Sequence, residues 1–328
     1  MLRAFIALVC VLNGTSVASA SDPSVPARAE SVPPVRADPD PGPSATAFLR
    51  FLPFFYDLYT FRGEAGATTV VAAFAVPAGM LEEERDAGRV RYRFDVSLVL
   101  ADTALGSVSR TDDSVFVGVP SSLSGEHLLH THIEVQAPPS GSTLQRVIMT
   151  DATTPGIGQL YGTPFPIPDY RGDHLMLSDV ALGYPDAATG WRRRDVTLAL
   201  LPTSQFPQSS FDVYYEIYNL PEGNRYSTEI AIERLDEDEG ERERVPGSSA
   251  VHTRFSGESA AGEDRTLEEL RRVEASLRRG SYRLTVTVTD EVSGQRATRT
   301  RLLEVRGWRR GATMVPALQR NGTPPPIA

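Results

Sequence analysis

Cysteine and lysine are the clearest absences from this sequence of 328 residues. The single cysteine is Cys10, and all 33 basic residues are arginine. The rest of the chain therefore cannot form a disulfide, a thiolate nucleophile or a cysteine-ligated metal site. This excludes the small disulfide-stabilised folds that are common among exported proteins. The use of arginine in place of lysine is typical of a GC-rich genome and predicts no special guanidinium chemistry.

Long apolar runs and excess positive charge are also missing. Beyond the first segment, no stretch of about 18 apolar residues occurs, so the sequence predicts no transmembrane segment in the mature chain. The formal net charge is −9. An acidic balance argues against nucleic acid or an anionic membrane as the partner.

The first twenty residues have the plan of a secretory signal peptide. Arg3 precedes an apolar core at 4–12, and small residues lead up to Ala20. We expect cleavage between Ala20 and Ser21. The alternative is a lipoprotein with Cys10 as the lipidated residue, but that site would truncate the apolar core. Either way, the sequence predicts export to the periplasm or to the outer side of the cell envelope.

The body of the chain has short apolar runs separated by turn residues, with almost no helical pattern. "TTVVAAFAVP" at 68–77 is a nearly continuous apolar strand. "FDVYYEIYNL" at 211–220 and "SYRLTVTVTD" at 281–290 alternate as half-buried antiparallel strands do. "RTLEELRRVEASL" at 265–277 has a Thr266/Glu269 capping box, yet its position favours a strand. Adjacent Leu302 and Leu303 predict a β-bulge.

One pattern occurs twice. G-S-x-x-x-x-V-x-x-T-D spans 141–151 and again 280–290. We expect each copy to be the penultimate strand of a β-sandwich, with Asp151 and Asp290 bonding the backbone of the turn that follows. The predicted fold class is all-β, with two tandem immunoglobulin-like or fibronectin-III-like β-sandwiches. The predicted parts are a signal peptide (1–20), a proline-rich disordered linker (21–46), a first sandwich (47–185), a connector (186–199), a second sandwich (200–306) and a flexible tail (307–328).

Three segments resemble the β-rich region of bacterial GWxTD-domain proteins. They are "HLMLSDVAL" (174–182), "FDVYYEIYNLPEG" (211–223) and "LRRGSYRLTVTVTDEVSG" (277–294). The likeness extends over about 55–305, but the pentad that names the family is absent. The chain thus resembles the sandwich portion without the name-giving domain. The resemblance supports the fold and implies no activity for any residue.

A histidine-rich stretch, "EHLLHTH" at 126–132, is the candidate metal site. On a strand, His130 and His132 project from one face, and Glu126 could complete a zinc or copper site. The competing interpretation is the solvent-facing polar side of an amphipathic strand.

The candidate binding surface consists of aromatic residues that cannot all point to the same face of their strand as the apolar core residues. Tyr214 and Tyr218 have the opposite parity from their apolar neighbours, and Phe55 and Tyr56 lie in "FFYDLYTF" at 54–61. Exposed aromatics on a sheet suit contact with a protein or a glycan. The alternative is that they pack between the two sandwiches.

Catalytic motifs are not found. The sequence has no G-x-S-x-G, P-loop, GxGxxG or HExxH pattern, so we expect no catalytic residues and no cofactor. The predicted function is that of a non-catalytic exported tandem β-sandwich protein that binds or scaffolds in the bacterial cell envelope. Its expected partner is an envelope protein, with a glycan as the second possibility. The alternatives are a carbohydrate-binding module that uses exposed aromatics, or a metal-binding site at 126–132.

Overall fold

The computed structural model describes residues 50–319 with gaps at 87, 104–105, 154–155, 186–189, 203–209, 236–248, 263, 275–276, 306–314 and 317. By its internal contacts the chain divides into Met1–Thr46 and one compact unit, Ala47–Ala328. The predicted signal peptide, its Ala20–Ser21 cleavage site and the proline-rich linker lie outside the described residues. No helix within the described ranges is long and apolar enough to cross a membrane.

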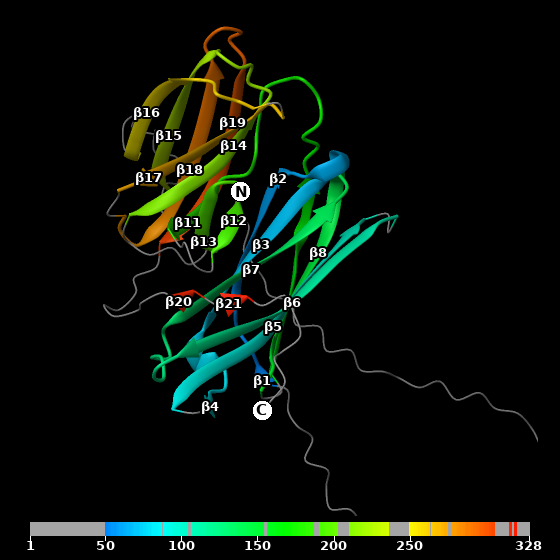
Figure 1. The fold of residues 1–328 in the computed structure, drawn as a ribbon, viewed down its shortest axis with the longest axis vertical. Helices are drawn as coiled ribbons and strands as arrows, with labels where there is room; N and C mark the ends of the chain where they lie inside the picture. Colours follow the sequence, from blue (N-terminus) through cyan, green and yellow to red (C-terminus); the bar gives the residue numbers. More distant parts are fainter. Residues whose placement is uncertain are drawn as a thin grey trace, which may run out of the picture. The chain divides into compact units, whose positions relative to one another are not determined.

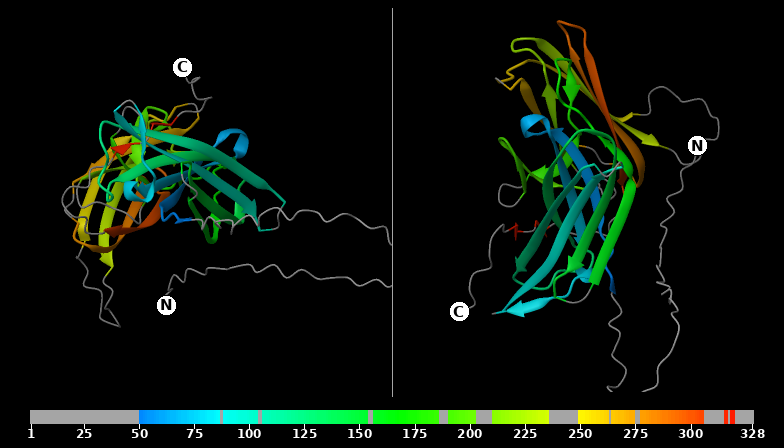
Figure 2. Two further views of the ribbon diagram at one scale, coloured as in Figure 1. Left: turned by 90° about the horizontal axis from the view of Figure 1, so that it is seen from below. Right: turned by 90° about the vertical axis from the view of Figure 1, so that its right-hand side faces the viewer.

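The fold is all-β, as predicted (Figure 1). Besides strands, there are only two short 3-10 helices in the described residues, η1 (Glu64–Gly66) and η2 (Ala78–Met80). Nearly all strand pairs are antiparallel, and the sheets stack in sandwich-like pairs that can be followed in Figure 2.

The first sandwich joins a seven-stranded and a four-stranded sheet. The larger sheet has the order β1 (Arg50–Phe51), β9 (Gly156–Ile167), β8 (Ser140–Asp151), β5 (Arg89–Asp102), β6 (Val108–Val119) and β21 (Leu318–Gln319), with β4 (Glu84–Asp86) on β5. The smaller sheet has the order β2 (Phe55–Arg62), β3 (Thr68–Pro77), β7 (Leu128–Ala137) and β20 (Val315–Pro316). A core that includes Phe74 and Phe94 fills the space between the two sheets.

The second sandwich joins a six-stranded and a four-stranded sheet. The first of these has the order β10 (Met176–Leu177), β14 (Phe211–Tyr218), β11 (Ala181–Pro185), β13 (Val196–Leu200) and β12 (Trp191–Arg193), with β17 (Thr266–Val273) on β14. The other has the order β16 (Ser249–Glu258), β15 (Arg225–Leu235), β18 (Gly280–Asp290) and β19 (Arg296–Val305). A second core, which includes Val213 and Val286, lies between them.

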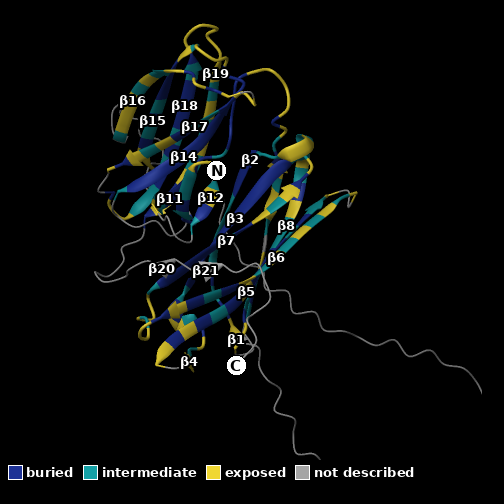
Figure 3. Cartoon of the chain, viewed as in Figure 1, coloured by how far each residue is buried: buried dark blue, intermediate teal, exposed yellow. Residues whose placement is uncertain are grey.

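A third apolar cluster joins the two sandwiches. Its members come from β2 and β3 on one side and from β11 to β14 on the other: Tyr59, Phe61, Val71, Ala73, Ala181, Trp191, Leu198, Leu200 and Tyr214. The cluster explains why β3 and β14 are buried along almost their whole length (Figure 3). The continuous apolar pattern of β3 predicted this. The expectation that β14 is half-buried was wrong, because its second face packs on the first sandwich.

The repeated pattern has the predicted structural role. β8 and β18 are each followed by the last long strand of their sandwich, β9 and β19. In each turn the aspartate accepts a hydrogen bond from the backbone two residues on: from Thr153 N to Asp151 Oδ1 at 2.9 Å and from Val292 N to Asp290 Oδ1 at 2.9 Å. The shared letters therefore encode a strand and its turn.

Four details differ from the sequence-based expectations. β10 and β11 belong to the second sandwich although the predicted boundary placed them in the first, because both pair with β14. The predicted connector at 186–199 contributes β12 and most of β13. The β18–β19 ladder keeps its register through Leu302, which is exposed, so the predicted bulge is not formed. In the predicted tail, β20 and β21 pair with the edges of β7 and β6, which offer unpaired backbone groups.

Candidate functional site at the junction of the two sandwiches

The predicted aromatic surface is not exposed. Tyr214 and Tyr218 both have 0% exposure, so the expectation that they face outward was wrong. Phe55 and Tyr56 are half-buried, and Tyr56 packs against the first core. The alternative interpretation, packing between the sandwiches, is confirmed for the two β14 tyrosines. Tyr214 lies 5.9 Å from Phe61 and Tyr218 lies 5.0 Å from Tyr170, centroid to centroid.

The predicted metal site is not assembled. Glu126 is exposed in the turn before β7, whereas His130 is 4% exposed and lies within the strand. Among the described residues, no group of three His, Cys, Asp or Glu side chains could hold a metal ion. Burial lowers the pKa of His130 and of His132 to about 4. The face that was interpreted as solvent-facing is instead covered, in part by β13 of the second sandwich.

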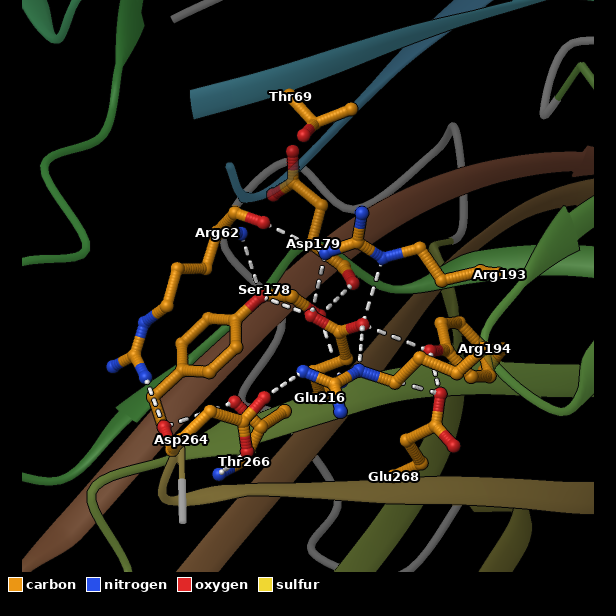
Figure 4. A network of polar contacts seen from close by, with 12 residues as sticks. Arg62, Thr69, Ser178, Asp179, Arg193, Arg194, Glu216, Asp264, Thr266 and Glu268 are labelled. Atoms are coloured by element: carbon orange, nitrogen blue, oxygen red, sulfur yellow. Dashed lines mark hydrogen bonds and ion pairs between the residues drawn. The ribbon is translucent and has the colours of Figure 1, made fainter. Parts of the chain in front are cut away.

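A buried carboxylate, Glu216, is the centre of the junction. It lies in the middle of β14 with 0% exposure. Arg193 donates to it through Nε (2.7 Å to Oε1) and Nη2 (3.1 Å to Oε2). The hydroxyls of Tyr214 and Tyr218 donate to Oε1 at 2.9 Å and to Oε2 at 2.5 Å. Arg193, Tyr214 and Tyr218 all donate to the carboxylate, so its charge is compensated where water cannot reach (Figure 4).

The network continues into the first sandwich. The backbone N of Arg62 donates to the hydroxyl of Tyr218 at 2.8 Å, and Arg193 Nη2 donates to the carbonyl oxygen of Arg62 at 2.7 Å. Both amide and hydroxyl of Thr60 donate to Asp179 Oδ2, at 2.9 and 2.7 Å. Strand β2 is therefore fixed to the second sandwich by hydrogen bonds as well as by the apolar cluster.

An ion pair crosses between the sandwiches near the start of β2. Arg301 of β19 lies 2.6 Å from Asp57 Oδ1, and both side chains are mostly buried. The guanidinium also stacks over the ring of Tyr59 at 4.1 Å. The hydroxyl of Tyr59 donates to the carbonyl oxygen of Leu201.

A second layer of charges surrounds Glu216 (Figure 4). Arg194 lies in the turn between β12 and β13, and its φ is positive at 48°. Its guanidinium bonds Asp264 and lies 3.8 Å from both Glu216 and Glu268. Burial raises the pKa of Glu268. The hydroxyl of Tyr214 lies 2.9 Å from Glu268 as well as from Glu216, and one phenolic proton can serve only one of them. The contact between Tyr214 and Glu268 is also a hydrogen bond when Glu268 carries a proton, because Glu268 can then donate to the Tyr214 hydroxyl.

A polar cavity of about 460 Å³ opens beside this network. Its wall carries four arginines and three carboxylates, and the lining residues are Arg62, Gly63, Glu64, Thr69, Glu134, Gln136, Arg192, Arg193, Arg194 and Asp264. A smaller cavity of about 210 Å³ shares Arg62 and Gly63 with it. The larger cavity lies within the size range of small-ligand sites, about 300–1,000 Å³.

The site around Glu216 was not among the sites predicted from the sequence. Two signals were present: Glu216 is a charged residue between two same-parity tyrosines on an otherwise apolar strand, and Trp191 precedes three successive arginines. Neither signal shows that the two segments meet, because β12 and β13 are joined to β14 through β11 in the sheet.

Comparison with known proteins adds little beyond the fold class. No protein-family model matches the chain, and no curated protein matches it. Red sea bream transglutaminase is similar at 12% identity with a TM-score of 0.21, over 77% of this chain and 31% of that chain. A calcium-binding mutant of Bacteroides uniformis β-glucuronidase 2 is similar at 12% identity with a TM-score of 0.26, over 76% and 28%. The chain spans less than a third of either protein, and such low TM-scores carry no argument about function.

Proposed function

We propose that this chain is a non-catalytic, exported protein that binds or scaffolds an envelope protein with two β-sandwiches held in a fixed arrangement. The observation that supports this best is the junction, where an apolar cluster and the buried ion pair of Arg301 with Asp57 join the sandwiches. A flexible pair of modules would not need such contacts. The resemblance to the sandwich region of GWxTD-domain proteins belongs to the same proposal.

The chemistry of the junction favours a structural role over a catalytic one. Glu216 accepts hydrogen bonds from Arg193, Tyr214 and Tyr218 and has no exposed surface. A general base must reach a substrate proton and have a free lone pair for it. A buried carboxylate engaged in this way is instead suited to holding strands in one register, a use of buried ion pairs that we take as a hypothesis for this protein.

The glycan alternative loses its main support, because Tyr214 and Tyr218 are not available as a stacking surface. The metal alternative also loses its support, because Glu126, His130 and His132 do not form a group that could hold a metal ion. A protein partner remains the favoured interpretation. Edge strand β16, which among the described strands pairs with β15 alone, offers backbone groups to which a partner strand could add.

The test has two parts. The full chain is expressed with a tag in the exporting bacterium, and mass spectrometry of the recovered protein reads its N-terminus. A start at Ser21 supports export, and an intact first segment contradicts it. Crosslinking of the envelope followed by purification then supports the proposal if one protein is recovered in stoichiometric amount. Recovery of the chain alone, at crosslinker levels that capture a known envelope complex, contradicts it.

A further inference from the structure

Arg62, at the end of β2, is a half-buried cation without a carboxylate partner. Its Nη1 donates to the backbone carbonyl of Asp264 at 3.0 Å, and its Nη2 donates to Asn219 Oδ1 at 3.0 Å. Its guanidinium lies 4.2 Å from the centroid of the Tyr218 ring. All these acceptors are neutral. Within the described ranges Arg62 forms no ion pair, whereas the neighbouring Arg193 and Arg194 pair with Glu216 and Asp264.

Burial of this guanidinium is costly because it disfavours the charged form, and the attraction of Asp264 and Glu216 offsets that cost only in part. Burial lowers the pKa of Arg62, in contrast to the pKa of Arg193, which its carboxylate partner raises despite burial. The Nε of Arg62 is buried and has no hydrogen-bond partner in the part of the chain that the structure describes. An anion beside this side chain would relieve the cost.

The two cavities meet at Arg62. It lines both the 460 Å³ and the 210 Å³ cavity together with Gly63. A Cβ at Gly63 would lie 2.2 Å from Gln136 Oε1 and 2.8 Å from the carbonyl oxygen of Ala67, so a side chain there would force the wall to move. Arg192, exposed on the wall of the larger cavity, likewise has no ion-pair partner among the described residues.

We propose that the larger cavity binds a small ligand through an oxyanion, a carboxylate or phosphate group, with Arg62 and Arg192 as the charged donors. Guanidinium groups match both oxyanions with paired N–H donors. Glu64, Glu134 and Asp264 on the same wall disfavour a polyanion and limit the ligand to a small negative charge. This inference goes beyond partner binding and does not depend on it.

The test is calorimetric titration of the full-length chain with inorganic phosphate and, separately, with acetate at matched ionic strength. Binding at about 1 mM or tighter is expected for at least one of them. Tighter binding of phosphate or of acetate identifies the oxyanion. Absence of binding for both probes at about ten times that concentration overturns the proposal.

Three variants locate the site. Arg62→Gln and Arg192→Gln each remove one proposed donor, and each is expected to weaken binding at least about 10-fold. Arg85→Gln removes a surface guanidinium that lies outside the cavity and pairs with Glu83, and it should leave binding unchanged. Arg192 is exposed, so its variant tests the site even if Arg62→Gln does not fold. Undiminished binding by Arg192→Gln, or equal losses in all the folded variants, overturns the assignment.

Discussion

Arg193 donates hydrogen bonds to both oxygens of Glu216, at 2.7 and 3.1 Å, although Glu216 has no exposed surface. The same guanidinium donates to the carbonyl oxygen of Arg62 in the first sandwich. One side chain therefore links β12, β14 and β2. Because desolvation of two charges offsets much of their attraction, such a pair is expected to define the junction geometry more than to add net stability.

Loss of one member of this pair should be far more harmful than loss of an exposed pair. Glu216→Ala leaves the Nε of Arg193 and the hydroxyl of Tyr218 without their acceptor, so we expect a loss of about 3–5 kcal/mol in the free energy of unfolding, measured by urea denaturation. Asp112→Ala breaks the exposed ion pair with Arg110 and should cost less than about 1 kcal/mol. Similar losses for the two variants would contradict the role assigned to Glu216.

The apolar cluster between the sandwiches should contribute through Trp191. This side chain is 1% exposed, with ring centroids 5.1 Å from Phe61 and 5.5 Å from Tyr214. Trp191→Ala is expected to destabilise the chain by about 3–5 kcal/mol. The exposed Val292 is the control, and Val292→Ala should change stability by less than about 0.5 kcal/mol. Thermal unfolding measures both, and an unchanged transition for Trp191→Ala would show that the cluster contributes little.

Acidification should destabilise the protein through His130. Its pKa is lowered to about 4 in the folded chain, against about 6.5 when unfolded. Between these values the unfolded chain binds more protons. The free energy of unfolding therefore falls by on the order of 3 kcal/mol as the pH drops from about 6.5 to about 4. Below about pH 4 the loss due to His130 does not grow further.

The measurement is urea denaturation at a series of pH values for the parent chain, His130→Leu and His174→Leu. His130→Leu should have a flatter dependence in this window, because one of the two histidines whose pKa burial lowers to about 4, His130 and His132, is gone. His174 is exposed, so its variant should follow the parent. Parallel curves for all three would assign the dependence to other groups.

Asp290 should stabilise the β18–β19 turn as an acceptor. It is 3% exposed and accepts from Val292 N (2.9 Å), Ser293 Oγ (2.6 Å) and Asn224 Nδ2 (3.0 Å). Asp290→Ala leaves these donors unpaired and is expected to cost about 1–3 kcal/mol, with a smaller loss for Asp290→Asn, which keeps one acceptor. Equal unfolding midpoints for the two variants would refute this.

The same aspartate gives a second pH dependence. Burial raises the pKa of Asp290, but the hydrogen bonds from Ser293, Val292 and Asn224 outweigh burial and lower it. Because the folded pKa is depressed, its contribution to stability is present above the unfolded value of about 3.9 and is lost as the pH falls through the folded pKa. Asp290→Asn should remove this acid-side loss, which urea denaturation below about pH 4 detects.

Local patterns were enough to predict strands whose burial they describe directly. The alternation of Tyr282, Leu284, Val286 and Val288 predicted the inward face of β18, and all four are buried. The turn aspartates were predictable because Asx turns depend on residues two positions apart. The position of 265–277 among strands correctly outweighed its Thr266/Glu269 capping box, since Thr266–Val273 pairs with β14.

The sequence by itself determined an all-β chain with two cores, because period-two apolar patterning and turn chemistry are local properties. Only the tertiary structure decided what covers the second faces of β3 and β14. It therefore decided whether Tyr214 and Tyr218 face solvent or pack between the sandwiches. Arg62 and Tyr218, which hydrogen-bond, are 156 residues apart in the chain. Alternation describes one strand at a time, and it carries no information about which distant strand packs on its other face.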